Sequence, residues 1–229
     1  MVSEAAVLGA LGRVLDPELD EAITSLGFVQ AVQIDGGAVE VQLRLPTFYC
    51  APNFSYMMVA DAREALEDVP GVERILVTLV DHHASQQITE GVASGRDFPA
   101  TFPGETDDDD LTGLRGIFRG KALYARLYRL CRTLLADGRS AADLARMRLA
   151  DLPDTEDTST YLERRSALGL DTSPDAPLLV AIDGRVVPPD EADLFLRRAR
   201  LFETSVESNG EYCRSLLQFR YGLTEGAAP

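Results

Sequence analysis

The sequence predicts an α+β protein, in which a small N-terminal α-β-β-α-β domain with a three-stranded mixed sheet precedes a mostly helical C-terminal domain. A predicted strand at 28–34, a tight turn at 35–37 and alternating apolar and polar residues along 39–45 are together typical of a β-hairpin. Apolar residues spaced three and four apart, before and after this hairpin and again in 123–135, are typical of helices. Together these patterns favour a small sheet with helices on one face, followed by a helical region.

The first domain, 1–90, contains five predicted elements. Ser3 can cap a helix that ends at Asp16-Pro17, because a residue before proline avoids the helical conformation. The spans 28–34 and 39–45 predict two strands, the apolar face of 58–69 predicts a helix, and 72–80 predicts a third strand. A helical crossover between the second and third strands makes that pair parallel and the sheet mixed.

Periodicity is lost at 91–110, which predicts a domain boundary. This span holds several glycines and prolines and then four consecutive aspartates at 107–110, a composition typical of a solvated linker. The remaining span, 111–229, is predicted to be mostly helical. It combines the wide apolar face of 123–135 with a short helix capped by Ser140 and helices at 190–203 and 211–220, and a short hairpin is suggested at 178–187.

Charge and composition restrict the function classes. The formal net charge is −15, and the excess of acids lies in the first half of the chain. An acidic surface repels phosphate backbones and anionic lipid, so nucleic acid and membranes are poor candidate partners. No apolar run reaches the roughly 20 residues that a membrane-spanning helix needs. The N-terminus lacks the features of a secretory signal, so a cytoplasmic location is expected.

The three cysteines are far apart and lack any CxxC spacing, so the sequence indicates neither a disulfide framework nor a self-contained zinc site. Cys131 lies inside the amphipathic helix beside Tyr128, and core packing is the better interpretation for it. Cys213, next to Tyr212, is interpreted in the same way. Cys50 differs because it follows a predicted strand and stands at the start of a predicted helix, where unpaired backbone N–H groups favour a thiolate.

Several motifs resemble the iron–sulfur cluster assembly domain family, which includes an accessory protein of bacterial phenylacetate degradation. The resemblance covers about residues 4–83. Family members place glycine directly before the loop cysteine and proline directly after it, whereas Tyr49 precedes Cys50 here and Pro52 follows only after Ala51. The matching residues are Asp16-Pro17-Glu18-Leu19 with Ile23, Leu26, Gly27 and Val29, then Thr47 and Cys50, and finally Val69-Pro70-Gly71-Val72.

The resemblance makes Cys50 the principal candidate ligand for a metal or cluster, with Thr47 and Pro52 shaping its loop. The other candidates lie at chain positions expected on the same sheet edge, and one thiolate, two imidazoles and two carboxylates are a plausible set for iron or zinc. Each has a local alternative, because Asp-Pro-Glu is good turn chemistry and histidines at a strand end are often merely exposed. Successive strand residues point to opposite faces, so at most one histidine is expected to bind. These other candidates are Asp16, Glu18, His82 and His83.

The resemblance implies an accessory or maturation factor that assists iron or iron–sulfur assembly in a client metalloenzyme, with iron or a cluster bound transiently. By analogy, a bacterial di-iron oxygenase is a client to test. Expected partners are the client or assembly proteins, and a homodimer is left open. The helical second domain would recognise the client.

Two other interpretations stay open. A metal-free interaction or folding factor on the same fold is favoured by the altered loop at Tyr49 and Ala51. A thiol enzyme is the third, but no orienting residue, nucleophile elbow or phosphate-binding loop accompanies Cys50. An enzyme is therefore not expected.

Overall fold

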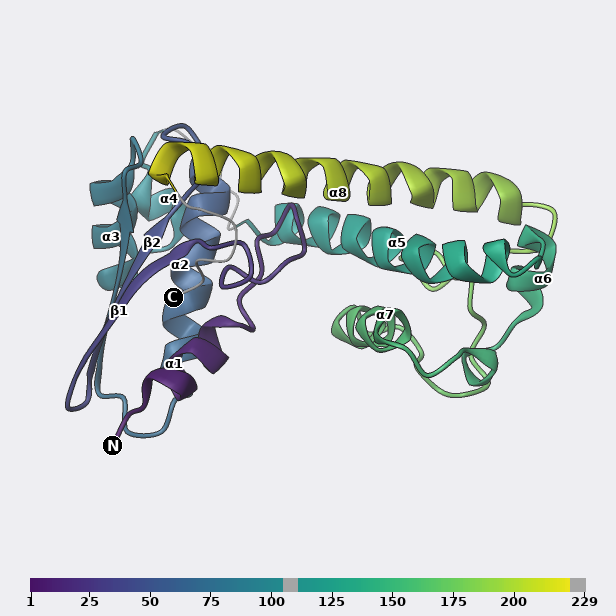
Figure 1. The fold of residues 1–229 in the computed structure, drawn as a ribbon, viewed down its shortest axis with the longest axis horizontal. Coiled ribbons are helices and arrows are strands. Elements are labelled where there is room, and N and C mark those ends of the chain that lie inside the picture. Colours follow the sequence, from purple (N-terminus) through teal and green to yellow (C-terminus); the bar gives the residue numbers. More distant parts are fainter. Residues whose placement is uncertain (105–110, 223–229) are drawn as a thin grey trace. The chain divides into compact units, whose positions relative to one another are not determined.

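The computed structural model describes residues 1–104 and 111–222, which divide into two compact units (Figure 1). Unit 1 consists of 1–115 together with the described residues from Asn209 on, and unit 2 consists of 116–208. The aspartate run at 107–110, predicted as part of a linker, lies outside the described residues. The first half of the chain therefore shares a unit with the last residues that the structure describes.

Unit 1 has the predicted order of helix, strand, strand, helix and strand, which confirms the fold class. The Ser3 side chain accepts a hydrogen bond from the Ala6 backbone N–H and thereby caps the first helix. These elements are α1 (Glu4–Leu11), β1 (Val29–Asp35), β2 (Ala38–Arg44), α2 (Pro52–Glu67) and β3 (Arg74–Val80).

The sheet is mixed, as predicted, with β2 in the centre. β1 pairs with β2 antiparallel through a tight turn in which Gly36 has a φ of 59°, a conformation that glycine adopts without strain. β2 pairs with β3 in parallel because α2 carries the chain back across the sheet. Val39, Val41 and Leu43 are buried on one face of β2, and α1 and α2 lie on one side of the sheet (Figure 1).

Two further helices extend unit 1 into the span that was predicted as a linker. They are α3 (Ser85–Ala93) and α4 (Phe98–Thr101). The Thr89 hydroxyl accepts the Leu79 N–H at 3.1 Å, so α3 covers the outer edge of β3. Phe98 and Phe102 are buried in the core of unit 1, and Asp97 caps α4. The glycines and prolines of this span dominate its composition, but the burial of two aromatic rings determines its structure.

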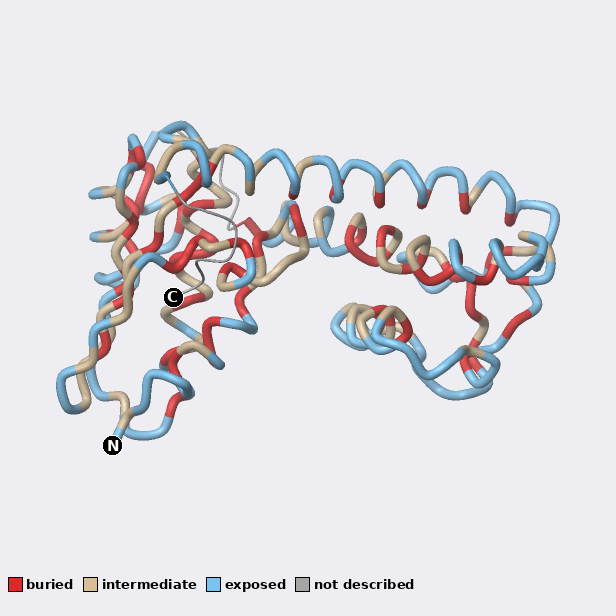
Figure 2. Tube along the Cα trace, viewed as in Figure 1, coloured by how far each residue is buried: buried red, intermediate tan, exposed pale blue. Residues whose placement is uncertain are grey.

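Unit 2 is built around the predicted amphipathic helix, which is part of α5 (Thr112–Ala136). The buried face of this helix contains Leu123, Leu127, Leu130 and Cys131. Figure 2 shows buried stretches along α5 in red. The other elements are the short helices α6 (Ala141–Arg146), η1 (Leu149–Asp151) and α7 (Glu156–Ala167), together with the part of α8 (Ala192–Tyr221) that precedes residue 209.

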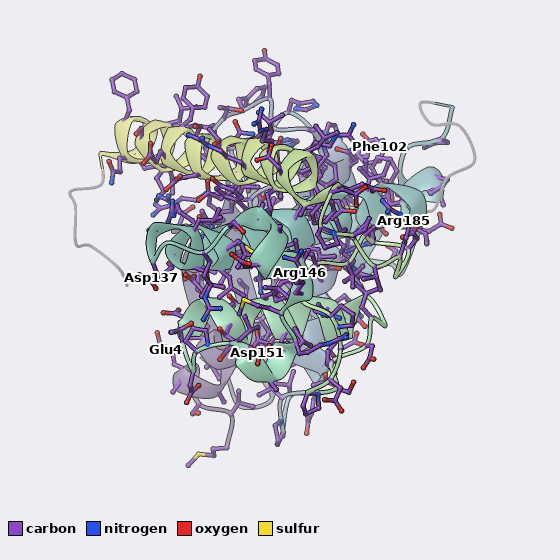
Figure 3. The ribbon with its side chains drawn as sticks, turned by 90° about the vertical axis from the view of Figure 1, so that its right-hand side faces the viewer. Glu4, Phe102, Asp137, Arg146, Asp151 and Arg185 are labelled. Atoms are coloured by element: carbon purple, nitrogen blue, oxygen red, sulfur yellow. The ribbon has the colours of Figure 1, made fainter. Side chains whose placement is uncertain are left out.

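The short elements of unit 2 are stabilised at their ends. Ser140 and Asp143 form the reciprocal hydrogen bonds of a capping box at the start of α6, which confirms that Ser140 is a cap. Figure 3 labels Arg146, in the last turn of α6 where a positive charge favours the helix dipole. It also labels Asp151, whose carboxylate accepts the Arg148 backbone N–H.

Two details of the second half differ from the prediction. The helices expected at 190–203 and 211–220 are one continuous helix, α8. In the span between the two predicted helices, Val206 is buried. Gly210 lies so close to the loop before β1 that a Cβ added to it would be 3.2 Å from a Glu21 oxygen. The suggested hairpin at 178–187 reduces to a single bridge between Val180 and Val186. No helix in the described part of the chain has the length and apolar character that crossing a membrane requires.

Candidate functional site

The candidate site is formed by loops at one edge of the sheet. The parallel strands β2 and β3 both end there, with Arg44 opposite Val80, and the antiparallel β1 begins there. Three loops consequently meet at this edge: 12–28 before β1, 45–51 after β2, and 81–84 after β3. The backbone N–H of His83 donates to the Phe48 carbonyl at 3.0 Å, which joins the second and third of these loops.

Cys50 lies in the loop between β2 and α2. Its side chain is half-buried, and its sulfur is 3.4 Å from the Thr47 hydroxyl, which ties the two ends of the turn together. Pro52 is the first residue of α2, a position where its missing N–H costs no hydrogen bond. Ala51 provides no side-chain cap, so backbone N–H groups of the first turn stay directed toward the loop that carries the thiol.

His82 holds this loop in place. It is 4 % exposed, and its Nδ1 accepts the Ala84 backbone N–H at 3.1 Å. Since a backbone amide can only donate, the ring proton resides on Nε2, which donates to the Cys50 carbonyl at 2.7 Å. The Ser55 hydroxyl is 3.3 Å from the same nitrogen. Burial lowers the pKa of His82, and the nearby charges of His83 and Arg220 act in the same direction. His82 is therefore a neutral support for the backbone of Cys50.

His83 has different surroundings. Its Nδ1 donates to the Phe48 carbonyl at 3.0 Å, and its ring lies against those of Phe48 and Tyr49. These two aromatic side chains are 45 % and 79 % exposed. The strand ends before the histidines, because Asp81 adopts a φ of 53°, and the two imidazole centroids are 4.4 Å apart. The strand alternation that was expected to separate His82 from His83 thus does not apply.

Asp16 and Glu18 shape the loop before β1. Asp16 is buried, and one of its carboxylate oxygens accepts the backbone N–H groups of Glu18 and Leu19 at 2.8 and 2.9 Å. Burial raises the pKa of Asp16 from 3.8 to about 6, against the effect of these hydrogen bonds. The Glu18 carboxylate accepts a hydrogen bond from the Asn209 side chain at 3.4 Å. Asp16 therefore bonds within its own loop, whereas Glu18 contacts a residue of α8.

The predicted ligands do not form a closed metal site. Across residues 1–104 and 111–222, histidine, cysteine, aspartate and glutamate side chains form no group of three or more that could hold a metal ion. The structure joins the Cys50 loop to His82 and His83 by hydrogen bonds through the backbone, while Asp16 is occupied by its own loop. At this edge the structure places the half-buried Cys50 thiol in a loop that these hydrogen bonds hold in place.

The end of α8 belongs to this edge, which could not be predicted from the sequence. Arg214 donates to Glu21 at 2.6 Å, and Arg220 donates to the carbonyls of Leu45 and Asp81 at 3.1 and 2.6 Å. Arg220 thereby connects the residues that directly follow β2 and β3. The only sequence signal was the apolar pattern of a helix at 211–220, which does not indicate where that helix packs.

Cys213 lies on this part of α8. It is half-buried and packs against the core of unit 1, as Cys50 does. Burial raises the pKa of Cys213 to about 11, and the charges of Asp16, Cys50 and Glu18 contribute to the rise. Cys213 therefore carries its proton at neutral pH.

This architecture, an α-β-β-α-β domain with a cysteine between its second strand and second helix, defines the class of protein. The sequence profile of the family described as iron–sulfur cluster assembly protein matches residues 4–77. An uncharacterised protein of Methanocaldococcus jannaschii is 34 % identical over 92 residues, which are 39 % of this chain and 94 % of that protein. The chain belongs to the iron–sulfur cluster assembly family through this first domain.

Two other similar proteins are called iron–sulfur cluster carrier proteins. The one from Synechocystis is 33 % identical over 87 residues, and the one from Mycobacterium bovis is 39 % identical over 87 residues. Each match covers 38 % of this chain but only 24 % and 22 % of the respective relative. The chain thus spans about a quarter of the length of these carriers.

Proposed function

We propose that this protein is an accessory factor that receives iron or an iron–sulfur cluster precursor at Cys50 and passes it to a client metalloenzyme. The observation that carries the proposal is the position of the Cys50 thiol, half-buried between Thr47 and the start of α2, in a domain of the iron–sulfur cluster assembly family. Thiolate sulfur is a preferred ligand of iron in clusters. In this proposal the metal is cargo, and the protein has no enzymatic activity.

An open site suits cargo that must leave again. A closed set of four protein ligands holds a structural metal firmly, whereas a site with few ligands leaves positions for solvent or for a second protein. The described residues provide no group of three ligands around Cys50, so other ligands would complete the coordination of the cargo. Exchange of those ligands gives a route for transfer to the client.

The surroundings of the thiol fit contact with another protein. Phe48 and Tyr49 expose their rings beside the Cys50 loop, and exposed aromatic residues are enriched in protein interfaces. We therefore propose that assembly proteins or the client bind over this aromatic pair, in the cytoplasm. A bacterial di-iron oxygenase, the client that the sequence resemblance implies, stays a prediction.

A metal-free interaction factor is the alternative function. Tyr49 takes the place of the family's glycine and is 79 % exposed, and His82 uses both ring nitrogens within the protein. Both observations favour a loop adapted to contact rather than to coordination. In this alternative the same aromatic pair binds the client, and Cys50 is dispensable.

Anaerobic reconstitution with ferrous iron and sulfide separates the two functions. Bound iron per chain and visible absorption are measured for the wild type, Cys50→Ser and Cys131→Ser. Cys131 is the matched control, because it is buried in unit 2. The proposal expects iron binding that disappears only in Cys50→Ser. A wild type that binds no iron, or a Cys50→Ser variant that binds as much as the wild type, would contradict it.

A further inference from the structure

We propose that Cys213 is the second thiol of the Cys50 site, so that the two cysteines act together as a dithiol for thiophilic ligands such as soft metal ions or trivalent arsenic. This inference deepens the proposed function and rests on it for its biological role. The pairing itself follows from the way the end of α8 is attached to unit 1 and can be tested without iron.

The first step is the face of α8 on which Cys213 lies. Asn209, Cys213 and Leu217 are four residues apart and so form one stripe along the helix. Asn209 donates to the Glu18 carboxylate. The Leu217 side chain lies against Gly27, and a Cβ added to Gly27 would be 3.3 Å from that side chain. Both neighbours of Cys213 on the stripe thus contact the loop before β1, and Cys213 faces this loop between them.

The second step is the attachment of this helix segment to the Cys50 loop. Arg220 lies two turns after Cys213 and donates to the carbonyl of Leu45, where the Cys50 loop begins. Its second hydrogen bond goes to the Asp81 carbonyl, next to the residue that holds the Cys50 backbone. The helix is therefore fixed at both ends of the segment that carries Cys213, and both thiols pack against the same core.

The electrostatics agree with this geometry. Burial raises the pKa of Cys213 to about 11, and the charges of Asp16, Cys50 and Glu18 contribute to this rise, whereas burial alone raises the pKa of Cys131 to about 12. Cys213 holds its proton until a ligand with high affinity for sulfur displaces it.

A dithiol has a chemical consequence for the cargo. Two sulfur ligands bind a soft cation far more selectively than one, yet they leave at least two coordination positions of a tetrahedral ion open. The described residues add no third ligand. Such a site can retain its cargo in transit while a partner supplies the remaining ligands.

Phenylarsine oxide tests the pairing directly on the reduced, folded full chain. One arsenic forms two As–S bonds, and the two thiol protons leave with the oxide oxygen as water, so no oxidant or reductant is needed. Native mass spectrometry counts the adducts. We expect one stable arsenical per wild-type chain, its loss in Cys50→Ser and in Cys213→Ser, and its retention in Cys131→Ser. A wild type without the adduct, or an adduct that survives in Cys213→Ser, would overturn the proposal.

A matched control tests the helix face. Ser215 is exposed and lies two residues from Cys213, on another face of α8. The double variant Cys213→Ser with Ser215→Cys keeps three cysteines but is expected to lose the bridging adduct, and its retention would show that the helix face does not matter. Circular dichroism spectra show whether each variant, including Cys213→Ala, is folded. A folded Cys213→Ala variant that still forms the bridging arsenic adduct also refutes the pairing.

The arsenic and iron experiments separate the two proposals. If arsenic bridges Cys50 and Cys213 while the wild type binds no iron, the dithiol stands and the proposed iron function fails. If Cys213→Ser still binds iron through Cys50 and no arsenic bridge forms in the wild type, the iron function stands and the dithiol fails.

Discussion

Replacement of His82 by alanine tests whether this residue supports the Cys50 loop. The substitution removes the donor to the Cys50 carbonyl and the acceptor for the Ala84 N–H, at heavy-atom distances of 2.7 and 3.1 Å. Each buried group left without a partner costs about 1–3 kcal/mol. Water entering the vacated space recovers part of this loss, so the expected decrease in the free energy of unfolding is about 2–4 kcal/mol.

His83→Ala is the matched control, because its side chain is exposed and makes one hydrogen bond to the Phe48 carbonyl. A loss below about 1 kcal/mol is expected for it. Urea denaturation followed by circular dichroism gives both free energies of unfolding, and hydrogen exchange by mass spectrometry localises the change. In His82→Ala the amides of 47–55 and 81–85 should exchange faster, while those of unit 2 stay unchanged. Equal midpoints for the two variants, or faster exchange confined to unit 2, would refute the assigned role of His82.

Two further predictions concern the acidic loop and the end of α8. The pKa of Asp16 rises from 3.8 to about 6 on folding, so between these values the folded state holds a proton that the unfolded state releases. The contribution of protonated Asp16 to the free energy of unfolding is therefore complete below about pH 4 and is lost as the pH rises through 6. Asp16→Asn should therefore raise the free energy of unfolding by about 1–3 kcal/mol at pH 8 and by little at pH 4, and a denaturation series that shows the larger gain at pH 4 would contradict this sign. Arg220→Met removes two hydrogen bonds to the carbonyls of Leu45 and Asp81 and should lower the free energy of unfolding by about 1–2 kcal/mol, with faster hydrogen exchange at 45–50. The control is Gln218→Met, a substitution at an exposed position of the same helix. Equal exchange in both variants would show that Arg220 does not fix the loop.

The parts of unit 1 that could be predicted from sequence are governed by local signals. The hairpin follows from the alternation along 39–45 and from Gly36, and α2 follows from its apolar repeat. The turn at Asp16 is similar, because its carboxylate bonds to backbone groups only two and three residues away. Each of these features is decided within a few residues, so the sequence pattern is sufficient.

The features that could not be predicted depend on distant partners. Arg220 and Leu45 are 175 residues apart, and no periodicity relates a helical arginine to a particular carbonyl so far away. The burial of Phe98 and Phe102 likewise depends on a core that forms from other segments. The role of His82 was missed for a related reason, since its two nitrogens are engaged by backbone groups that any sequence would offer.

The division of unit 1 between the two ends of the described chain has a consequence for its biosynthesis. Residues 209–222 leave the ribosome after every other described part, including the whole of unit 2. A nascent chain can form the sheet, α2 and the Cys50 loop long before Arg214 and Arg220 exist to bind Glu21 and the strand ends. During this interval the loop is held by contacts within the first domain, from Thr47, His82 and His83. The Cys50 loop therefore gains its contact with Arg220 only after synthesis has passed the end of α8.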